Sequence, residues 1–592
     1  LQLDVSGTTQ LLGAGHKGTG SITITNGQVL ESVEGVLGHL NGSHGTGTVS
    51  GAGSAWNVQE YLRVGRFGSG TLDVTDGATV SSLFAVLGQH VGASGTVTVG
   101  AGSQWTNTEA LRVGEWGTGS LTVESGGVVD TRVLLASIND LHGGGTIHAR
   151  GAILDDIHLQ FDSTHGLQQT LAFGSGGELH LDLTAGGNGG LGVGYRGEGT
   201  MTISEGRKVV TDGLPGYGGT GTGGVIGFMP GSNGSATVTG VDAEGNPSTW
   251  ESIYGIHVGV RGTGSLTVSD GALVDAGVSF IGGAEGASGT VTVIGTDRAG
   301  APTTWRSYGG LLVGADLGEG FGEGRIDVLS GGYALAGVDF NSPVLPTVTF
   351  GPKGQVNVSG SIEDVEGVLK PSTFWAGGVL QMSGDMTVSD GGLFVTQGLS
   401  ELGNTPDDPS VATIRGSDSA GNASTWAALG GMLIGRFGTA ELHIEDGAHV
   451  MTGSGAIGSF HSDADWDAVV NVTGSNGNGV PSRWEMSGIL YAGGTPFGST
   501  GVTGTLNITD GGRVSSSEGW IGVGGTAPGT VSVRGHDGHG LTSTWDVGGR
   551  LRVGVESTGQ LAILDGGIVN SASGYVGELN GSSGLVTVSG AG

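Results

Sequence analysis

Short runs of alternating hydrophobic and polar residues recur along the chain. Leu72-Asp73-Val74, Leu121-Thr122-Val123 and Leu266-Thr267-Val268 are examples. In each run the apolar side chains point to one face and the polar one to the other, which predicts half-buried β-strands. Glycine, Asp-Gly or Ser-Gly turns bound the runs. No segment has the spacing of an amphipathic helix, so we predict an all-β chain with no significant helix.

The runs belong to a longer repeat. Its first half reads L-x-V-G-x-x-G-x-G-x-L-x-V-x-x-G-x-x-V at residues 62–80 and returns at 111–128, 191–209, 256–274, 432–450 and 551–569. The second half ends in T-V-T-V-x-G and a tryptophan, and these closing residues are Trp56, Trp105, Trp250, Trp305, Trp426, Trp484 and Trp545. A half this short cannot bury its apolar side alone, whereas stacked copies share one core. We predict a parallel β-solenoid (a β-helix, expected to be right-handed) of about 24 short coils.

Changes in the repeat divide this expected continuous solenoid into five ranges. Residues 1–130 are regular, 131–190 form irregular coils with longer loops, 191–340 are regular with protruding turns, 341–384 are irregular again, and 385–592 are regular. The chain stops where the pattern calls for S-x-W, so we expect a truncated repeat at the C-terminus.

Two kinds of turn connect the strands. Asp-Gly pairs such as Asp76-Gly77 mark one, where the Asp side chain is expected to bond the backbone two residues on. The other has the form G-x-[DN]-x-x-G-x-x-[ST]-x-W, and its third position is occupied by Asp242, Asp297, Asp418, Asn476 and Asp537. Because loops on one face of a solenoid commonly bind partners, we expect these turns to form a binding edge.

The closing tryptophans have two interpretations. They could stack against sugars at the surface, or they could plug the solenoid with each indole N–H bonded to a turn. Their strict recurrence favours the structural role.

Composition narrows the possible partners. Of 592 residues 130 are glycine, and 22 basic against 54 acidic residues give a net charge of −32. Such a chain repels nucleic acid at long range. It has no cysteine, which excludes disulfides, thiolate metal sites and a cysteine nucleophile.

The candidate chemical motifs are incomplete. Asp463, Asp465 and Asp467 have the D-x-D-x-D spacing of a calcium loop, but Ala468 stands where glycine is needed and Gly474 where a bidentate glutamate is needed. His536 and His539 lack a third zinc ligand nearby. We therefore expect no catalytic residues, no cofactor and no metal, with Ca²⁺ at the three aspartates as the weak alternative.

The consensus LRVGxxGTGSLTVxxGGxV followed by GxxGTVTVxGxxSxW resembles the repeat of autotransporter (type V secretion) passenger domains and of PEP-CTERM-anchored surface proteins. The resemblance implies an extracellular β-helical stalk on a bacterial surface or secreted from it, often an adhesin. It also implies export through a C-terminal translocator barrel in the outer membrane, which this chain does not contain. It brings no catalytic residues with it.

These observations favour an adhesin or self-association module acting through the turn edge. Its partner would be a host or bacterial surface protein, a glycan, or a second copy of the chain, and not nucleic acid. A polysaccharide-acting enzyme on the same scaffold and a passive structural spacer remain the alternatives.

Overall fold

The computed structural model describes residues 10–184, 189–213, 223–316, 318–338, 347–364, 366–406, 408–458, 466–496, 503–524 and 528–590. In these ranges the regular structure consists of β-strands and one short 3-10 helix, η1 (Ile138–Asp140). The predicted all-β fold class is thereby confirmed. The chain forms two compact units, the first of residues 1–238 and 242–265, the second of residues 239–241 and 266–592.

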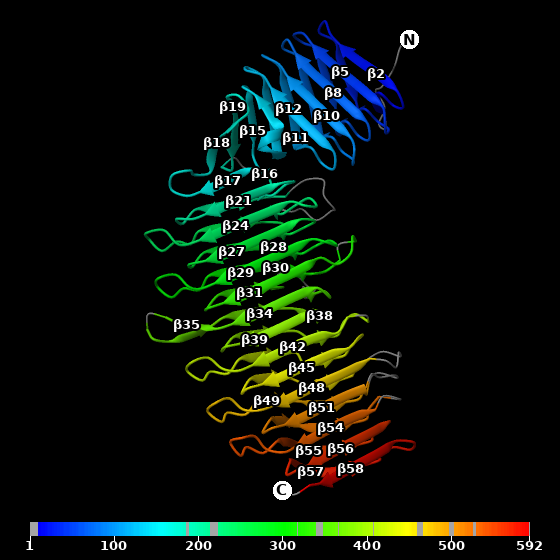
Figure 1. Cartoon of the computed structure of the whole chain (residues 1–592), viewed down its shortest axis with the longest axis vertical. Helices are drawn as coiled ribbons and strands as arrows, with labels where there is room; N and C mark the ends of the chain where they lie inside the picture. Colours follow the sequence, from blue (N-terminus) through cyan, green and yellow to red (C-terminus); the bar gives the residue numbers. More distant parts are fainter. Residues whose placement is uncertain are drawn as a thin grey trace. The chain divides into compact units, whose positions relative to one another are not determined.

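Each coil carries up to three short strands, and most strands pair in parallel with those of successive coils, so that three rows of strands result (Figure 1). The first row consists of two separate sheets, since β14 and β17 belong to different ones. The first row contains the alternating T-V-T-V segments. In the first unit these strands are β2 (Thr19–Ile24), β5 (His44–Ser50), β8 (Ser69–Thr75), β10 (Ser94–Val99), β12 (Thr118–Val123), β14 (Leu141–Gly143), β17 (Ile157–Phe161), β21 (Glu198–Ile203) and β24 (Asn233–Thr239). In the second unit they are β29 (Ser288–Ile294), β31 (Glu323–Leu329), β34 (Gly354–Ser359), β39 (Asp385–Ser389), β42 (Ser410–Arg415), β45 (Ala440–Glu445), β48 (Asp467–Thr473), β51 (Thr503–Thr509), β54 (Gly529–Arg534), β56 (Thr558–Leu564) and β58 (Ser583–Ser589). Strand β27 (Thr263–Ser269) spans the boundary between the units in sequence.

The second row holds the tryptophans. In the first unit it comprises β3 (Val29–Ser32), β6 (Ala55–Val58), β9 (Thr79–Leu87), β11 (Gln104–Val113), β13 (Val128–Ser137), β15 (Thr146–Ala149), β19 (Gly177–Asp182), β22 (Lys208–Thr211) and β25 (Thr249–Ser252). In the second unit it comprises β28 (Leu273–Ile281), β30 (Thr304–Val313), β32 (Tyr333–Ala336), β37 (Thr373–Ala376), β40 (Leu393–Thr396), β43 (Thr425–Ala428), β46 (His449–Thr452), β49 (Arg483–Met486), β52 (Arg513–Ser516), β55 (Thr544–Val553) and β57 (Ile568–Val576).

The third row contains the L-x-V-G segments, and the longest second-row strands continue into it through a shift of register. Its separate strands in the first unit are β1 (Leu11–Ala14), β4 (Glu34–Leu37), β7 (Tyr61–Val64), β16 (Ala152–Asp155), β20 (Leu191–Val193), β23 (Gly224–Ile226) and β26 (Ile256–Val258). In the second unit they are β33 (Thr347–Phe350), β38 (Val379–Met382), β41 (Ser400–Leu402), β44 (Met432–Ile434), β47 (Gly455–Ile457), β50 (Ile489–Ala492) and β53 (Glu518–Ile521).

Two antiparallel pairs interrupt the parallel pattern of the described strands. In the first unit β18 (Gln168–Phe173) runs antiparallel to β19, and in the second unit β35 (Ser361–Glu363) runs antiparallel to β36 (Leu369–Pro371). Both lie in the ranges where the sequence repeat breaks.

The core follows from the two-residue period of the first row. Val97 pairs with Leu72 in the coil before it and with Leu121 in the coil after it. All three side chains are fully buried, while the alternate residues Thr96 and Thr98 are half-buried on the outer face. Each such Leu or Val contributes on the order of 1.5–3 kcal/mol when buried. The contribution depends on both neighbours, so a coil is stable only within the stack.

The Asp-Gly turns place two successive residues in the left-handed region. The φ angle is 57° at Asp76 and 81° at Gly77. Among residues with a side chain, Asp and Asn tolerate this conformation best, and glycine adopts it freely. The predicted bond from the Asp side chain to the backbone two residues on is not what forms. The Asp76 carboxylate instead accepts the hydroxyl of Ser50, 2.6 Å away at the end of the preceding first-row strand.

A buried hydroxyl explains the spacing [ST]-x-W. The Ser424 Oγ accepts the backbone N–H of Gly391, the glycine of the Asp-Gly turn in the preceding coil, at 3.0 Å. The same bond, at 2.9 to 3.1 Å, joins Gly27 to Ser54, Gly77 to Ser103, Gly206 to Ser248, Gly271 to Thr303, Gly331 to Ser372, Gly447 to Ser482 and Gly511 to Ser543. Two residues later the tryptophan points inward because side chains two apart share a face.

Candidate functional site

Five turns of the second unit form a row, called the turn row below, at residues 295–304, 360–373, 416–425, 474–483 and 535–544. Each turn leads from a first-row strand to the next second-row strand. In Figure 1 these loops project one below another on the left side of the second unit, the side that carries the label β35.

One side chain closes each turn. The Asp418 Oδ1 accepts the backbone N–H groups of Ala420 at 3.0 Å and Asn422 at 2.8 Å. An isolated antiparallel bridge between Ser417 and Ala423 seals the base of the turn. Asp297, Asn476 and Asp537 make the same pair of bonds, to residues two and four positions on. In the first unit, Asp242 does so with Glu244 and Asn246.

The turn aspartates therefore organise backbone and are not poised for proton transfer. At Asp537 the hydrogen bond from the Ser475 hydroxyl, followed by those from the backbone, lowers the pKa of the carboxyl group. At Asp242 the bonds from Asn246 lower the pKa in the same way. A carboxylate so held stays ionised. The carbonyl of Asn476 replaces the carboxylate at its own turn, so the charge is not required for the geometry.

One member of the turn row was missed by the sequence pattern. The hairpin of β35 and β36 occupies the place of a turn, and Asp364 Oδ1 accepts the N–H groups of Glu366 at 3.0 Å and Val368 at 2.9 Å. The pattern required a closing tryptophan, but here Phe374 occupies that register position and pairs with Phe394. A glycine followed by S-x-F would have been the signal for this longer version.

Contacts between turns join the row together. The Lys370 ammonium group donates to the Gly300 carbonyl at 3.3 Å. The Ser361 hydroxyl donates to Asp418 Oδ2 at 3.1 Å.

Two further bonds continue the series. The Asn476 amide donates to the Ser417 hydroxyl at 3.4 Å, and the Ser475 hydroxyl donates to Asp537 Oδ2 at 2.5 Å. The bonded turns lie two coils apart, so the row is a regularly spaced surface. Its exposed tip residues include Arg298, Ala299, Glu366, Ser419, Ala420, Asn478 and His539.

The closing tryptophans lie in the core and not at the surface. Trp56, Trp105, Trp250, Trp305, Trp426, Trp484 and Trp545 are at most 1% exposed. Sugar stacking at these residues is thus incompatible with the folded structure. The predicted indole bond to a turn is also wrong. Trp426 Nε1 donates to the hydroxyl of Thr396, the last residue of a second-row strand, at 3.2 Å, and Trp56, Trp250 and Trp545 bond Ser32, Thr211 and Ser516 in the same way.

The weak calcium candidate falls mostly on residues that the structure does not describe. Asp463 and Asp465 lie outside the described residues, and Asp467 is an exposed residue at the start of β48. Among the residues that the structure describes, no group of three His, Asp or Glu side chains could hold a metal ion.

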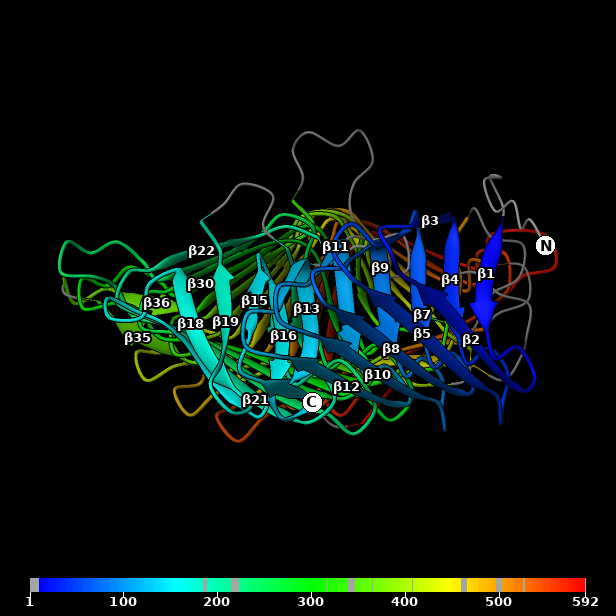
Figure 2. The same ribbon diagram turned by 90° about the horizontal axis from the view of Figure 1, so that it is seen from above.

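A polar groove of about 750 Å³ lies on the outer face of the first unit. Five strands line it, namely β11, β13, β15, β19 and β18, which Figure 2 shows side by side. Its charged and imidazole-bearing residues are Asp130, Arg132, His148, Arg150, His180 and Asp182. Sequence reasoning missed this groove because its residues come from both the regular range 1–130 and the irregular range 131–190 and show no motif.

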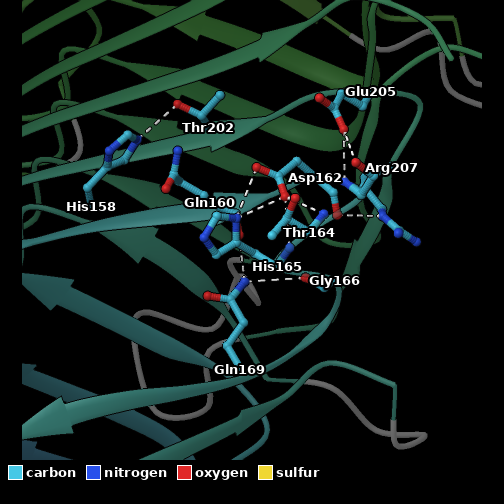
Figure 3. A network of polar contacts seen from close by, with 11 residues as sticks. His158, Gln160, Asp162, Thr164, His165, Gly166, Gln169, Thr202, Glu205 and Arg207 are labelled. Carbon is cyan, nitrogen blue, oxygen red and sulfur yellow. Dashed lines mark hydrogen bonds and ion pairs between the residues drawn. The ribbon is translucent and has the colours of Figure 1, made fainter.

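A network of polar contacts holds the chain reversal that leads into β18 (Figure 3). The Asp162 Oδ1 accepts the backbone N–H groups of Thr164 and His165, both at 2.8 Å, and also contacts the His165 ring. The Arg207 guanidinium donates to the Asp162 carbonyl at 2.8 Å. Glu205 accepts the Ser163 N–H at 3.1 Å. The segment that leads into β18, the last strand of the groove, is therefore anchored to the next coil through Glu205 and Arg207.

No helix among the described residues is long and apolar enough to cross a membrane. Among solved structures, a match is found to the TibC-catalysed, hyper-glycosylated fragment of TibA, residues 55–350. It has 11% sequence identity and a TM-score of 0.16, over 94% of this chain and 99% of that chain. A likeness this weak carries no argument about binding. No protein-family model and no curated protein matches the sequence.

Proposed function

We propose that the chain is a non-catalytic binding module, displayed on a bacterial surface or secreted, that adheres to a repetitive partner through the turn row. The partner is a host or bacterial surface protein or glycan, or another copy of the chain. The observation that carries the proposal is the row itself: five turns with the same closing bonds, joined to one another, whose tips are exposed. The resemblance of the repeat to autotransporter passengers supports the location.

Repetition is what makes such a surface suited to adhesion. Each tip offers only a few exposed side chains, so a single turn binds weakly. Turns at a regular spacing engage a periodic partner together, and every contact after the first becomes intramolecular. The ionised turn carboxylates are held by backbone N–H groups, which supports a binding role without chemistry.

Beads coated with the whole chain test this proposal. One variant carries the four tip substitutions Arg298→Ala, Glu366→Ala, Asn478→Ala and His539→Ala, which leave the closing Asp and Asn residues intact. A control carries Glu556→Ala and Gln560→Ala, exposed residues of the second unit outside the row. We expect parent and control beads to clump or to adhere to cells, and the tip variant to lose most of that activity.

Equal adhesion of the tip variant and the parent would leave the chain as a passive spacer. Parent beads that neither clump nor adhere above albumin-coated beads would also overturn the proposal. Release of shortened sugars from a polysaccharide panel would replace it with an enzymatic function.

A further inference from the structure

The groove of the first unit presents polar side chains in regular lines. Register places Thr106 beside Asp130, Asp130 beside His148, and His148 beside His180. Thr170 of the antiparallel strand β18 faces His180 at the end of the line. Neighbouring strands lie about 4.8 Å apart, so a polar group recurs at roughly the length of one sugar ring. The groove is thus matched to a linear ligand that lies across the strands.

A second line runs parallel to the first. Arg132, Arg150 and Asp182 each lie two residues beyond Asp130, His148 and His180 on the same strands. Side chains two residues apart share a face and are roughly 7 Å apart. A ligand in the groove therefore meets polar groups on both of its sides.

The lining offers no exposed aliphatic side chain as an anchor for a ligand. Ala149 and Leu181 are the aliphatic residues of the lining, and both are at most 2% exposed. Peptide partners usually need exposed aromatic or aliphatic anchors, and small apolar ligands need an apolar pocket. Carboxylate, amide, hydroxyl, imidazole and guanidinium groups together supply both donors and acceptors, as a polyhydroxylated ligand requires.

Although the chain as a whole carries a net charge of −32, the groove offers one arginine that can pair with a carboxylate of the ligand. The groove carboxylates already have partners: Gln104 donates to Asp130 at 2.6 Å and Gln168 donates to Asp182 at 3.1 Å. Arg132 pairs with Glu109 at 2.8 Å. Arg150, by contrast, is exposed, and none of the ion pairs among the described residues includes it. Its guanidinium fork is available for a carboxylate, which it can bind through two parallel hydrogen bonds.

We propose that this groove binds an acidic oligosaccharide, a chain of uronate sugars, with the Arg150 guanidinium pairing with a sugar carboxylate. The hydroxyl groups of the ligand bond Thr106, Asp130 and His148 of the first line. The site is separate from the turn row and does not depend on the function proposed for it.

Isothermal titration of the whole chain with oligogalacturonate tests the proposal, and the carboxyl-reduced oligosaccharide of equal length is the neutral comparison. We expect binding of the acidic oligomer and at least tenfold weaker binding of the neutral one, since the neutral oligomer lacks the charge-assisted pair with Arg150. Arg150→Gln should weaken binding of the acidic oligomer to the same extent. The matched control Arg513→Gln removes an exposed arginine of the second unit that lies outside the turn row, and it should leave the affinity unchanged.

Equal affinity for the two oligomers, no binding of either, or an unchanged affinity in Arg150→Gln would overturn the proposal. Circular dichroism of the variant confirms that its fold is intact, and Arg150 is exposed, so its loss creates no cavity. Shortening of the oligomer during the titration would show that the groove binds it, and would overturn the proposal that the chain is non-catalytic. The four-tip variant of the turn row should bind the acidic oligomer like the parent.

Discussion

At the scale of the residue, one buried hydroxyl orders each Asp-Gly turn. Ser424 is fully buried, and its hydroxyl accepts the Gly391 N–H. In Ser424→Ala that N–H would be buried without an acceptor, which costs about 1–3 kcal/mol. We expect faster hydrogen exchange of the Gly391 amide and a lower free energy of unfolding. The exposed Ser419→Ala is the control, and an unchanged exchange rate at Gly391 would contradict the role of the hydroxyl.

A second residue makes stability depend on pH. Burial lowers the pKa of His257, in β26, from 6.5 to about 4. Above pH 6.5 the imidazole is neutral in both states, so it has no effect there. Between pH 6.5 and about pH 4 only the unfolded chain binds the proton, so the free energy of unfolding falls as the pH falls.

Urea titrations at pH 8 and pH 5 measure this effect. The parent should lose up to about 2 kcal/mol more than His257→Gln between these two pH values. At pH 8 the difference between the two proteins is the baseline for the substitution itself. Equal losses in parent and variant would show that His257 is not the group responsible.

At the scale of the element, the turn depends on an oxygen acceptor and not on charge. Asp418→Ala removes the acceptor of the Ala420 and Asn422 N–H groups, each bond contributing about 0.5–1.5 kcal/mol. Asp418→Asn keeps the acceptor, and Asn476 already plays this part at its own turn. We expect hydrogen exchange at residues 420 and 422 to rise about twofold to tenfold in the alanine variant and to change little in the asparagine variant. A similar rise in both variants would instead assign the effect to the lost charge.

In strands β37 and β40 a phenylalanine occupies the register position of the closing tryptophan, so the core accepts either aromatic side chain there. Phe374 stacks on Phe394 with ring centroids 4.9 Å apart, and Phe394 meets Trp426 edge to face at 6.0 Å. The aromatic column therefore continues through the coil that lacks a tryptophan. The β35–β36 hairpin, which precedes Phe374 in the chain, can be longer than the other turns because its extra residues lie outside the core.

At the scale of the whole molecule, net charge opposes association between copies. The charge of −32 and the pI near 4.6 imply repulsion at neutral pH that salt screens, since the Debye length falls from about 10 Å at 0.1 M to about 3 Å at 1 M. If the turn row binds a second copy, sedimentation velocity should show more association at 1 M salt than at low salt. The four-tip variant should remain monomeric at both. Association that weakens with salt would indicate an interface of complementary charges instead.

The coil itself could be derived from the sequence. Alternation predicted that Leu72, Val97 and Leu121 face the core, and the recurrent Asp, Asn and tryptophan positions predicted where the turns come. These contacts join each residue to its copy one or two coils away, so the period of the sequence alone specifies the partner. The partners of the indole N–H groups and of the Asp76 carboxylate were predicted incorrectly, because they depend on side-chain and backbone conformations that the repeat pattern does not reveal.

Only the tertiary structure showed what the irregular ranges form, namely the groove and the contacts that join the turn row. The reversal before β18 depends on Glu205 reaching Ser163, 42 residues earlier, and the turn row depends on Ser361 reaching Asp418, 57 residues later. Neither pair follows from the period, because an irregular coil or a longer hairpin intervenes. The repeat thus determines the solenoid through near neighbours, whereas the groove and the connected turn row exist only once distant, non-repeating residues are brought together.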